Sequence, residues 1–105
     1  MALKTTLNET EHRYEAHVDG ELAGFARYRV DGERIVFTHT EVDDDYEGQG
    51  VGSQLVRTAL SDVRSEGVSV LPFCPFVRAY IARHTEYLDL VPEEMRDKFD
   101  LPADA

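Results

Sequence analysis

The sequence predicts one α/β domain with a mixed sheet: a three-stranded antiparallel meander, then a helix, a parallel strand and C-terminal helices. Three observations predict this class. Strand-forming runs are separated by two Asp-Gly pairs, an apolar stripe of helical period follows them, and a short apolar run follows the stripe. A strand, a helix and a strand in succession favour a right-handed crossover between parallel neighbours.

The meander is predicted from runs rich in β-branched and aromatic residues at 13–18, 21–30 and 33–42. Asp19-Gly20 and Asp31-Gly32 separate these runs, and Asp-Gly is a strong signal for a two-residue hairpin turn. Side chains alternate between the two faces of a strand. The third run is therefore expected to direct one set of side chains to one face: Ile35, Phe37, His39 and Glu41. The other face would carry Val36, Thr38, Thr40 and Val42.

The predicted crossover follows a polar loop at residues 43–50. Val51 begins an apolar stripe at helical spacing, and Gly67 is placed to end that helix. The wholly apolar run at 68–71 reads as a short strand in the centre of a sheet, which Pro72 would end.

Two C-terminal helices are predicted from prolines. Pro75 stands at the first position of a second helix, and Pro92 precedes a short third helix that reaches about Phe99. We therefore expect a single domain over residues 1–105, with a core at about 12–99 and a frayed tail at 100–105.

The composition is strongly acidic, with a formal net charge of −10, and Lys4 and Lys98 are the only lysines. Nucleic acids and anionic membranes bind basic patches, so both are excluded as general partners. Abundant carboxylates with scarce lysine suggest a salt-adapted, halophilic host. No apolar run approaches the roughly 20 residues that span a bilayer, and the N-terminal segment turns polar too early for a signal peptide. These features predict a soluble cytoplasmic protein.

The stretch "YEGQGVGS" at residues 46–53 joins the third strand to the first helix. Backbone N–H groups without side chains in the way, at a helix N-terminus, form a cradle for phosphate oxygens. No lysine follows the glycines as a Walker loop requires, and the spacing is one residue shorter than the dinucleotide fingerprint. A flexible turn with close helix–strand packing is the alternative.

The longer run "VDDDYEGQGVGSQL" resembles the coenzyme A pyrophosphate loop of the GNAT superfamily of N-acetyltransferases. Gly50 and Gly52 match its two small positions, and Glu47 stands where the family prefers Gln or Arg. The resemblance implies acetyl-CoA as co-substrate, an amine as acceptor and no metal. It also implies a set of CoA-binding residues: Val42, Gly48, Gln49, Gly50, Val51, Gly52 and Ser53. A carboxylate at position 47 would repel a pyrophosphate unless it points away.

The segment "LPFCPFVRAYIARHTEYLDLV" is similar to the short, minimal single-domain branch of that superfamily, which has a Cys-Pro-[Phe/Tyr] step and a histidine on the third strand. With it, the resemblance covers residues 12 to 92. It implies an active site containing His39 and Cys74.

The residues themselves also favour Cys74 as a reactive group. With Pro75 first in its helix, Cys74 is the N-cap, where the helix dipole favours a thiolate. If the face of Phe37 carries this helix, His39 and Cys74 meet as a Cys–His pair. Two mechanisms are open: direct attack of the amine with His39 as base and Cys74 lining the site, or prior acetylation of Cys74. A buried apolar cysteine and a core-edge histidine are the alternatives.

The remaining candidates are fewer and less specific. Tyr80 is a lesser candidate for protonating the departing CoA thiolate, because its register is one off the family pattern and a core aromatic explains it equally well. Arg78 and then Arg83 are the expected partners of the CoA phosphates, because the chain is otherwise acidic. We expect a monomer or a small homo-oligomer. The alternative function is a non-catalytic sensor or interaction module that binds CoA or acyl-CoA.

Overall fold

The described chain, residues 2–102 of a computed structural model, forms a five-stranded sheet in which strands adjacent in sequence are adjacent in space. The strands are β1 (Leu3–Asn8), β2 (Arg13–Val18), β3 (Glu21–Asp31), β4 (Arg34–Val42) and β5 (Ser69–Pro72). The first four pair antiparallel and β5 runs parallel to β4. The predicted mixed sheet is confirmed, although it gains an edge strand, β1, that the sequence analysis did not identify.

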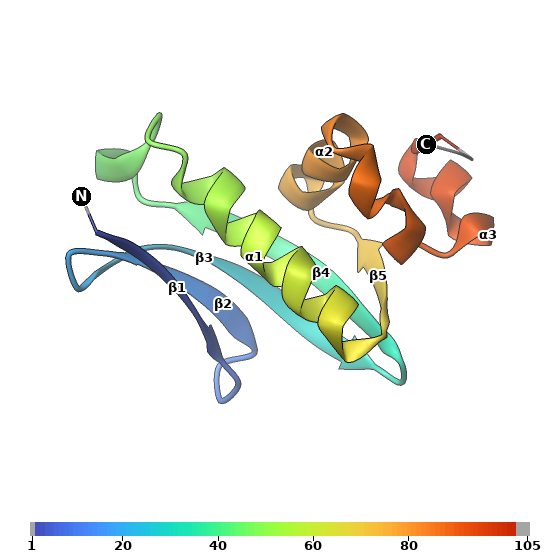
Figure 1. Ribbon diagram of the computed structural model, residues 1–105, viewed down its shortest axis with the longest axis horizontal. Coiled ribbons are helices and arrows are strands. Elements are labelled where there is room, and N and C mark those ends of the chain that lie inside the picture. Colours follow the sequence, from blue (N-terminus) through green and yellow to red (C-terminus); the bar gives the residue numbers. More distant parts are fainter. Residues whose placement is uncertain (1, 103–105) are drawn as a thin grey trace.

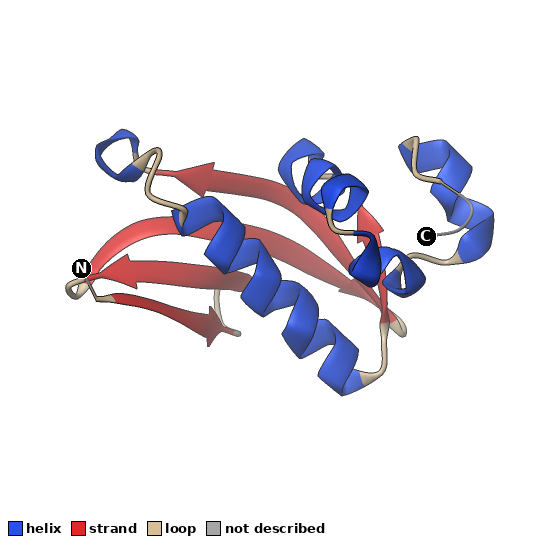
Figure 2. Ribbon diagram, turned by 45° about the horizontal axis from the view of Figure 1, so that its top comes forward, coloured by secondary structure: helices blue, strands red, loops and turns tan. Residues whose placement is uncertain are grey.

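The crossover helix α1 (Val51–Glu66) lies diagonally across one face of the sheet (Figures 1 and 2). Its predicted apolar stripe is buried against the strands: Val51, Leu55, Val56, Ala59, Leu60 and Val63. Gly67 ends the helix as predicted, with a left-handed φ of 72° and its N–H donating to the Arg64 carbonyl.

The C-terminal helices follow β5. Helix α2 (Pro75–Arg83) lies beside α1 at the β4–β5 edge (Figure 1). It is followed by a 3-10 helix (Thr85–Leu90), α3 (Glu93–Arg96) and a 3-10 turn (Asp97–Phe99). Pro72 is the last residue of β5 and pairs with Phe37. A proline is acceptable there because β5 is an edge strand of the sheet. The expectation that this strand lies in the centre of the sheet is therefore wrong.

Residues on both sides of the expected core of 12–99 also pack into the fold. Leu3 of β1 packs against the core, and Leu101 is buried with its N–H donating to the Arg96 carbonyl. The predicted frayed tail therefore does not include Leu101, whereas residues 103–105 lie outside the described residues. None of the helices within residues 2–102 combines the length and the hydropathy needed to cross a membrane.

Candidate acetyl-CoA site

The glycine stretch, residues 46–53, runs from the connection after β4 into the first turn of α1. After Val42 the chain makes a 3-10 turn (Asp44–Tyr46), which Asp43 caps by accepting from the Asp45 N–H at 2.9 Å. Gly48 and Gly50 then adopt left-handed φ values of 79° and 78°. Such angles strain residues that carry a Cβ, so glycine at these two positions is what allows α1 to begin at Val51.

A hollow of about 290 Å³, here called the loop hollow, lies over this turn. Its lining comes from the end of β4, the glycine stretch and α2: Val42, Tyr46, Glu47, Gly48, Gly50, Val51, Gly52, Ser53 and Phe76. Gly52 is closed in by α2, because a Cβ there would lie 2.6 Å from the Phe76 ring. The N–H groups of the first turn of α1 have no helical partners, so they are available to an anion at this end.

The predicted CoA residues are therefore brought together, except for one side chain. Gln49 does not line the hollow, and its Nε2 donates to the Asp45 carbonyl at 3.4 Å. Glu47, the departure from the family pattern, does line the hollow, so an acidic residue borders the anion cradle.

The predicted arginines lie elsewhere. Arg78 donates from Nη2 to the Phe73 carbonyl at 3.2 Å, and its guanidinium carbon stands 5.9 Å from the centroid of the Phe99 ring. Arg83 is exposed in the last turn of α2. Neither lines the loop hollow, whose lining contains no Lys or Arg.

Strands β4 and β5 separate beside this hollow. They pair only from Arg34 to Phe37, and the chain of β5 then turns into α2, with the Cys74 N–H donating to the Phe37 carbonyl at 2.9 Å. The Asp43 N–H donates to the Ala23 carbonyl, so this pair of β4 and β3 is hydrogen-bonded. Along an antiparallel ladder, hydrogen-bonded pairs alternate with pairs that exchange no hydrogen bonds, and Val42 and Thr40 belong to the second kind. The backbone groups of Thr40 and Val42 consequently point away from β3, toward the side where β5 is missing.

A β-bulge changes the face that the second half of β4 presents. Tyr28 pairs with Phe37 and Arg27 with His39, so Thr38 is an extra residue in β4. The extra residue reverses the side-chain alternation beyond it. The predicted sharing of one face by Phe37 and His39 is therefore wrong: Phe37 is buried in the core, whereas His39 is exposed on the opposite face.

Cys74 lies on the core side of the bulged strand. It is the N-cap of α2 as predicted, is 2% exposed, and its Sγ lies 3.2 Å from Thr40 Oγ1. Neighbouring residues of a strand point to opposite faces, so Thr40 contacts Cys74 while His39 points away from it. The two side chains flank the same stretch of β4 without forming the expected Cys–His pair.

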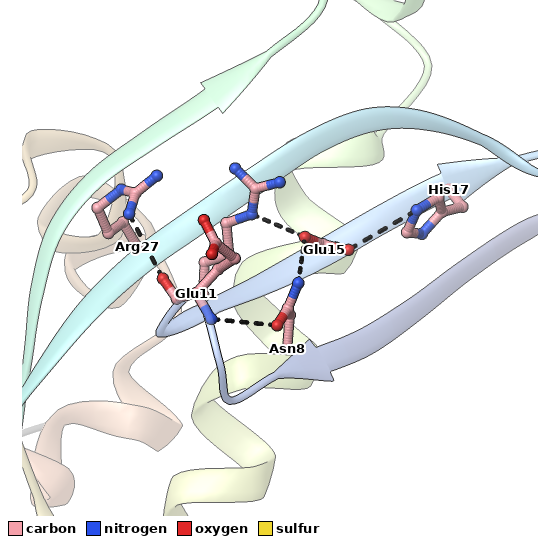
Figure 3. Close-up of polar contacts among 6 residues, drawn as sticks. Asn8, Glu11, Glu15, His17 and Arg27 are labelled. Carbon is pink, nitrogen blue, oxygen red and sulfur yellow. Dashed lines mark hydrogen bonds and ion pairs between the residues drawn. The ribbon is translucent and has the colours of Figure 1, made fainter.

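His39 belongs to a polar and aromatic surface on the open face of the sheet. Its Nε2 stands 3.5 Å from Glu41 Oε2, and its ring lies edge-on to Phe25 with the centroids 6.1 Å apart. Farther along the same face, Glu15 accepts from Arg13 Nε at 2.7 Å and Asn8 Nδ2 at 3.0 Å (Figure 3).

A second depression, the open-face hollow of about 210 Å³, is not lined by His39 itself, but His39 contacts two of its lining residues, Phe25 and Glu41. Its lining combines two carboxylates with apolar groups: Leu22, Ala23, Gly24, Phe25, Glu41 and Asp43. Such a surface suits a cation. Sequence reasoning identified neither this hollow nor the contact of Thr40 with Cys74, because both depend on the bulge.

Tyr80 lies on the buried side of α2. It is 4% exposed and its ring stacks on His84 at a centroid distance of 4.1 Å. Burial raises the pKa of Tyr80, and nearby Tyr87 adds to the increase, while the positive charge of Arg57 opposes it. Tyr80 is thus protonated at neutral pH, and its packing accounts for a core role without invoking chemistry.

The comparison with protein families decides the classification. The model described as GCN5-related N-acetyl-transferase matches residues 13–90, from β2 to the end of the 3-10 helix after α2. The chain belongs to this family. The sequence-based resemblance to GNAT N-acetyltransferases is therefore confirmed.

Solved structures share the fold of this GNAT chain. A GCN5-like putative N-acetyltransferase from Staphylococcus aureus has 24% identity and a TM-score of 0.67, with 86% of this chain and 88% of that one covered. Ard1 from Thermoplasma volcanium has 26% identity and a TM-score of 0.54, with 60% and 44% covered.

The ribosomal-protein-S18-alanine N-acetyltransferase from Escherichia coli has 24% identity and a TM-score of 0.55, with 57% of this chain covered. The chain spans only 39% of the length of that enzyme. The likeness to these larger proteins therefore concerns the fold of only part of each chain.

Proposed function

We propose that this GNAT chain transfers an acetyl group from acetyl-CoA to an amine. The observation that carries the proposal is the loop hollow, in which a side-chain-free turn and the N-terminus of α1 adjoin the separation of β4 and β5. Acetyl-CoA supplies the acetyl group as a thioester. The N–H groups of Val51, Gly52 and Ser53 suit its pyrophosphate, because they are unpaired within the helix and lie at its positive end.

The outward-facing backbone of Thr40 and Val42 suits the amide-bearing arm of the same molecule. These groups would exchange hydrogen bonds with an extended ligand, as they would with an additional strand beside β4. The carbonyl end would then lie near the bulge, between His39 on one face and Cys74 on the other.

The acceptor amine is proposed to approach from the open face. Glu41 and Asp43 line the open-face hollow and attract the protonated amine, and Phe25 offers an aromatic surface to it. His39 takes one proton from the bound ammonium, and the neutral amine then attacks the thioester carbonyl, while Glu41 Oε2, 3.5 Å from His39 Nε2, stabilises the imidazolium. The carbon–sulfur bond breaks as the amide bond forms, and the departing CoA thiolate takes up the second proton, which the amide nitrogen releases. This role of His39 belongs to the direct mechanism.

The position of Cys74 also favours direct transfer. Cys74 is 2% exposed and its Sγ is directed to Thr40, and within residues 2–102 no hydrogen bond joins this thiol to a basic side chain. A thiol nucleophile generally needs an adjacent base, and His39 lies across the strand. In this proposal Cys74 lines the site and shapes it.

Two variants test this assignment. His39→Asn is expected to lower kcat by about a hundredfold at neutral pH while acetyl-CoA affinity is retained. Cys74→Ala is expected to keep most of the turnover, measured as CoA release with a panel of polyamines, amino sugars and lysine peptides. An acetylated protein trapped by rapid quench in wild type and missing in Cys74→Ala would contradict direct transfer.

A non-catalytic module that binds CoA or acyl-CoA is the second candidate. The observation favouring it is the loop hollow's charge, since Glu47 lines the hollow and no basic residue does. This module predicts a thermal shift with acetyl-CoA and no amine-dependent CoA release. Turnover above the uncatalysed rate with any amine of the panel would eliminate it.

A further inference from the structure

A third depression lies at the far end of the molecule from the proposed acetyl-CoA site. This acidic pocket, of about 250 Å³, is formed under the C-terminal half of α1 by the ends of β1, β3 and β4. Asp62 is ten residues along α1 from Gly52, which corresponds to about 15 Å of helix. The pocket is therefore separate from the loop hollow.

Its lining has two chemically distinct parts. Three carboxylates, Glu9, Asp62 and Glu66, stand around Tyr14 and Tyr28, and the rest of the wall is aliphatic. Among the aliphatic residues, Leu7 is 39% and Val30 58% exposed. Such exposure of large apolar side chains beside carboxylates leaves an apolar surface in the pocket that a ligand can cover.

The negative charge of this pocket is not neutralised by the protein. No lysine or arginine lines it, and none of its three carboxylates forms an ion pair with another residue in the range 2–102. Glu66 is also the last residue of α1, where the helix dipole adds negative potential. A cation is consequently favoured there.

Tyr28 supplies an independent indication of a ligand. It is 9% exposed and lines the pocket, yet its hydroxyl makes no hydrogen bond with any other described residue. By contrast, the Tyr14 hydroxyl donates to Asp62 Oδ2 at 2.5 Å. Burial raises the pKa of Tyr28, and the charges of Glu9 and Asp62 raise it further, so its ring lies in their negative field.

A metal ion does not suit this arrangement, because no group of three or more His, Cys, Asp or Glu among residues 2–102 could hold one. Aromatic faces, separated carboxylates and aliphatic walls instead match an organic ammonium with a short alkyl chain. We propose that the acidic pocket binds a small primary alkylammonium ion, with its charge near Glu9, Asp62 and Glu66 and its chain against Leu7 and Val30.

The Tyr28 hydroxyl accepts a hydrogen bond from this ammonium. The pocket is a second amine site in addition to the acceptor position proposed above. Its occupancy does not depend on acetyl transfer, so failure of one proposal leaves the other standing.

The test uses n-hexylammonium chloride and the full chain in isothermal titration calorimetry at about pH 7.5, where the amine is protonated. Hexylammonium is expected to bind, and 1-hexanol, which has the same chain without the charge, to bind at least about tenfold more weakly. Equal affinities, or no heat with hexylammonium up to about 10 mM, would overturn the proposal.

Variants assign the binding to the pocket. The double variant Glu9→Gln, Glu66→Gln replaces two exposed carboxylates and is expected to weaken hexylammonium binding by about tenfold. Glu93→Gln, an exposed carboxylate of α3, is the matched control and should change nothing. Tyr28→Phe keeps the ring and should weaken binding severalfold even if the double variant folds poorly. Unchanged affinity in Tyr28→Phe and the double variant contradicts the site.

Discussion

Gly50→Ala tests whether acetyl-CoA binding depends on the left-handed backbone conformation of the glycine stretch. Gly50 has φ 78° at the N-cap of α1, and nothing lies within 4 Å of the position that a Cβ would take. The penalty is therefore conformational and not steric. A left-handed alanine costs about 1–2 kcal/mol, offset in part by the smaller entropy of its unfolded chain, so about 1 kcal/mol of folding free energy should be lost.

Gly67→Ala is the matched control, because Gly67 ends the same helix at φ 72° in equally open space. Each variant is expected to lower the melting temperature by about 5 °C. Only Gly50→Ala should disturb the N–H groups at the loop hollow. Losing one hydrogen bond to a charged phosphate corresponds to an affinity loss of about tenfold or more.

The assay is the dissociation constant for acetyl-CoA by isothermal titration calorimetry, with melting curves of both variants. Gly50→Asn should recover part of the stability, since asparagine tolerates this backbone region better. Wild-type affinity in Gly50→Ala would refute the reasoning, as would an equal loss of affinity in Gly67→Ala.

Four further outcomes are expected. Glu47→Gln should tighten acetyl-CoA binding severalfold at low salt, corresponding to about 1 kcal/mol, with a smaller gain at high salt; weaker binding would contradict the repulsion. The hydrogen bond from Arg13 lowers the pKa of Glu15. The stabilisation of the fold by this pair is therefore present above the unfolded pKa of about 4.3 and is lost as the pH falls through the lower folded pKa. Glu15→Gln should accordingly lower the melting temperature at pH 7 but not at about pH 2.5. Leu60→Ala should cost about 2–5 kcal/mol in urea unfolding, because Leu60 is fully buried, and a loss below about 1 kcal/mol would place it outside the core. If the acidic surface is salt-adapted, the melting temperature should rise between about 0.1 and 3 M KCl, and a flat or falling curve would remove that hypothesis.

The sequence predicted the secondary structure correctly where local signals are strong. Asp-Gly turns, a helical apolar stripe and prolines at helix starts each depend on a few neighbouring residues, so the meander, α1 and α2 could be predicted. Strand β1 was missed because its polar run has only Leu3 and Leu7 as apolar positions, and it is held as an edge strand by pairing with β2.

By itself, the sequence determined the glycine turn, because left-handed backbone at Gly48 and Gly50 depends on the absence of a Cβ. It also determined Cys74 as the N-cap of α2, since Pro75 can belong to a helix only in its first turn. The partner of Cys74 was decided by the tertiary structure. One extra residue, Thr38, reverses the faces of β4 beyond it, and a bulge arises from strand pairing and has no sequence signal of its own. The same bulge directs His39 to the open face and leaves Thr40 beside the thiol.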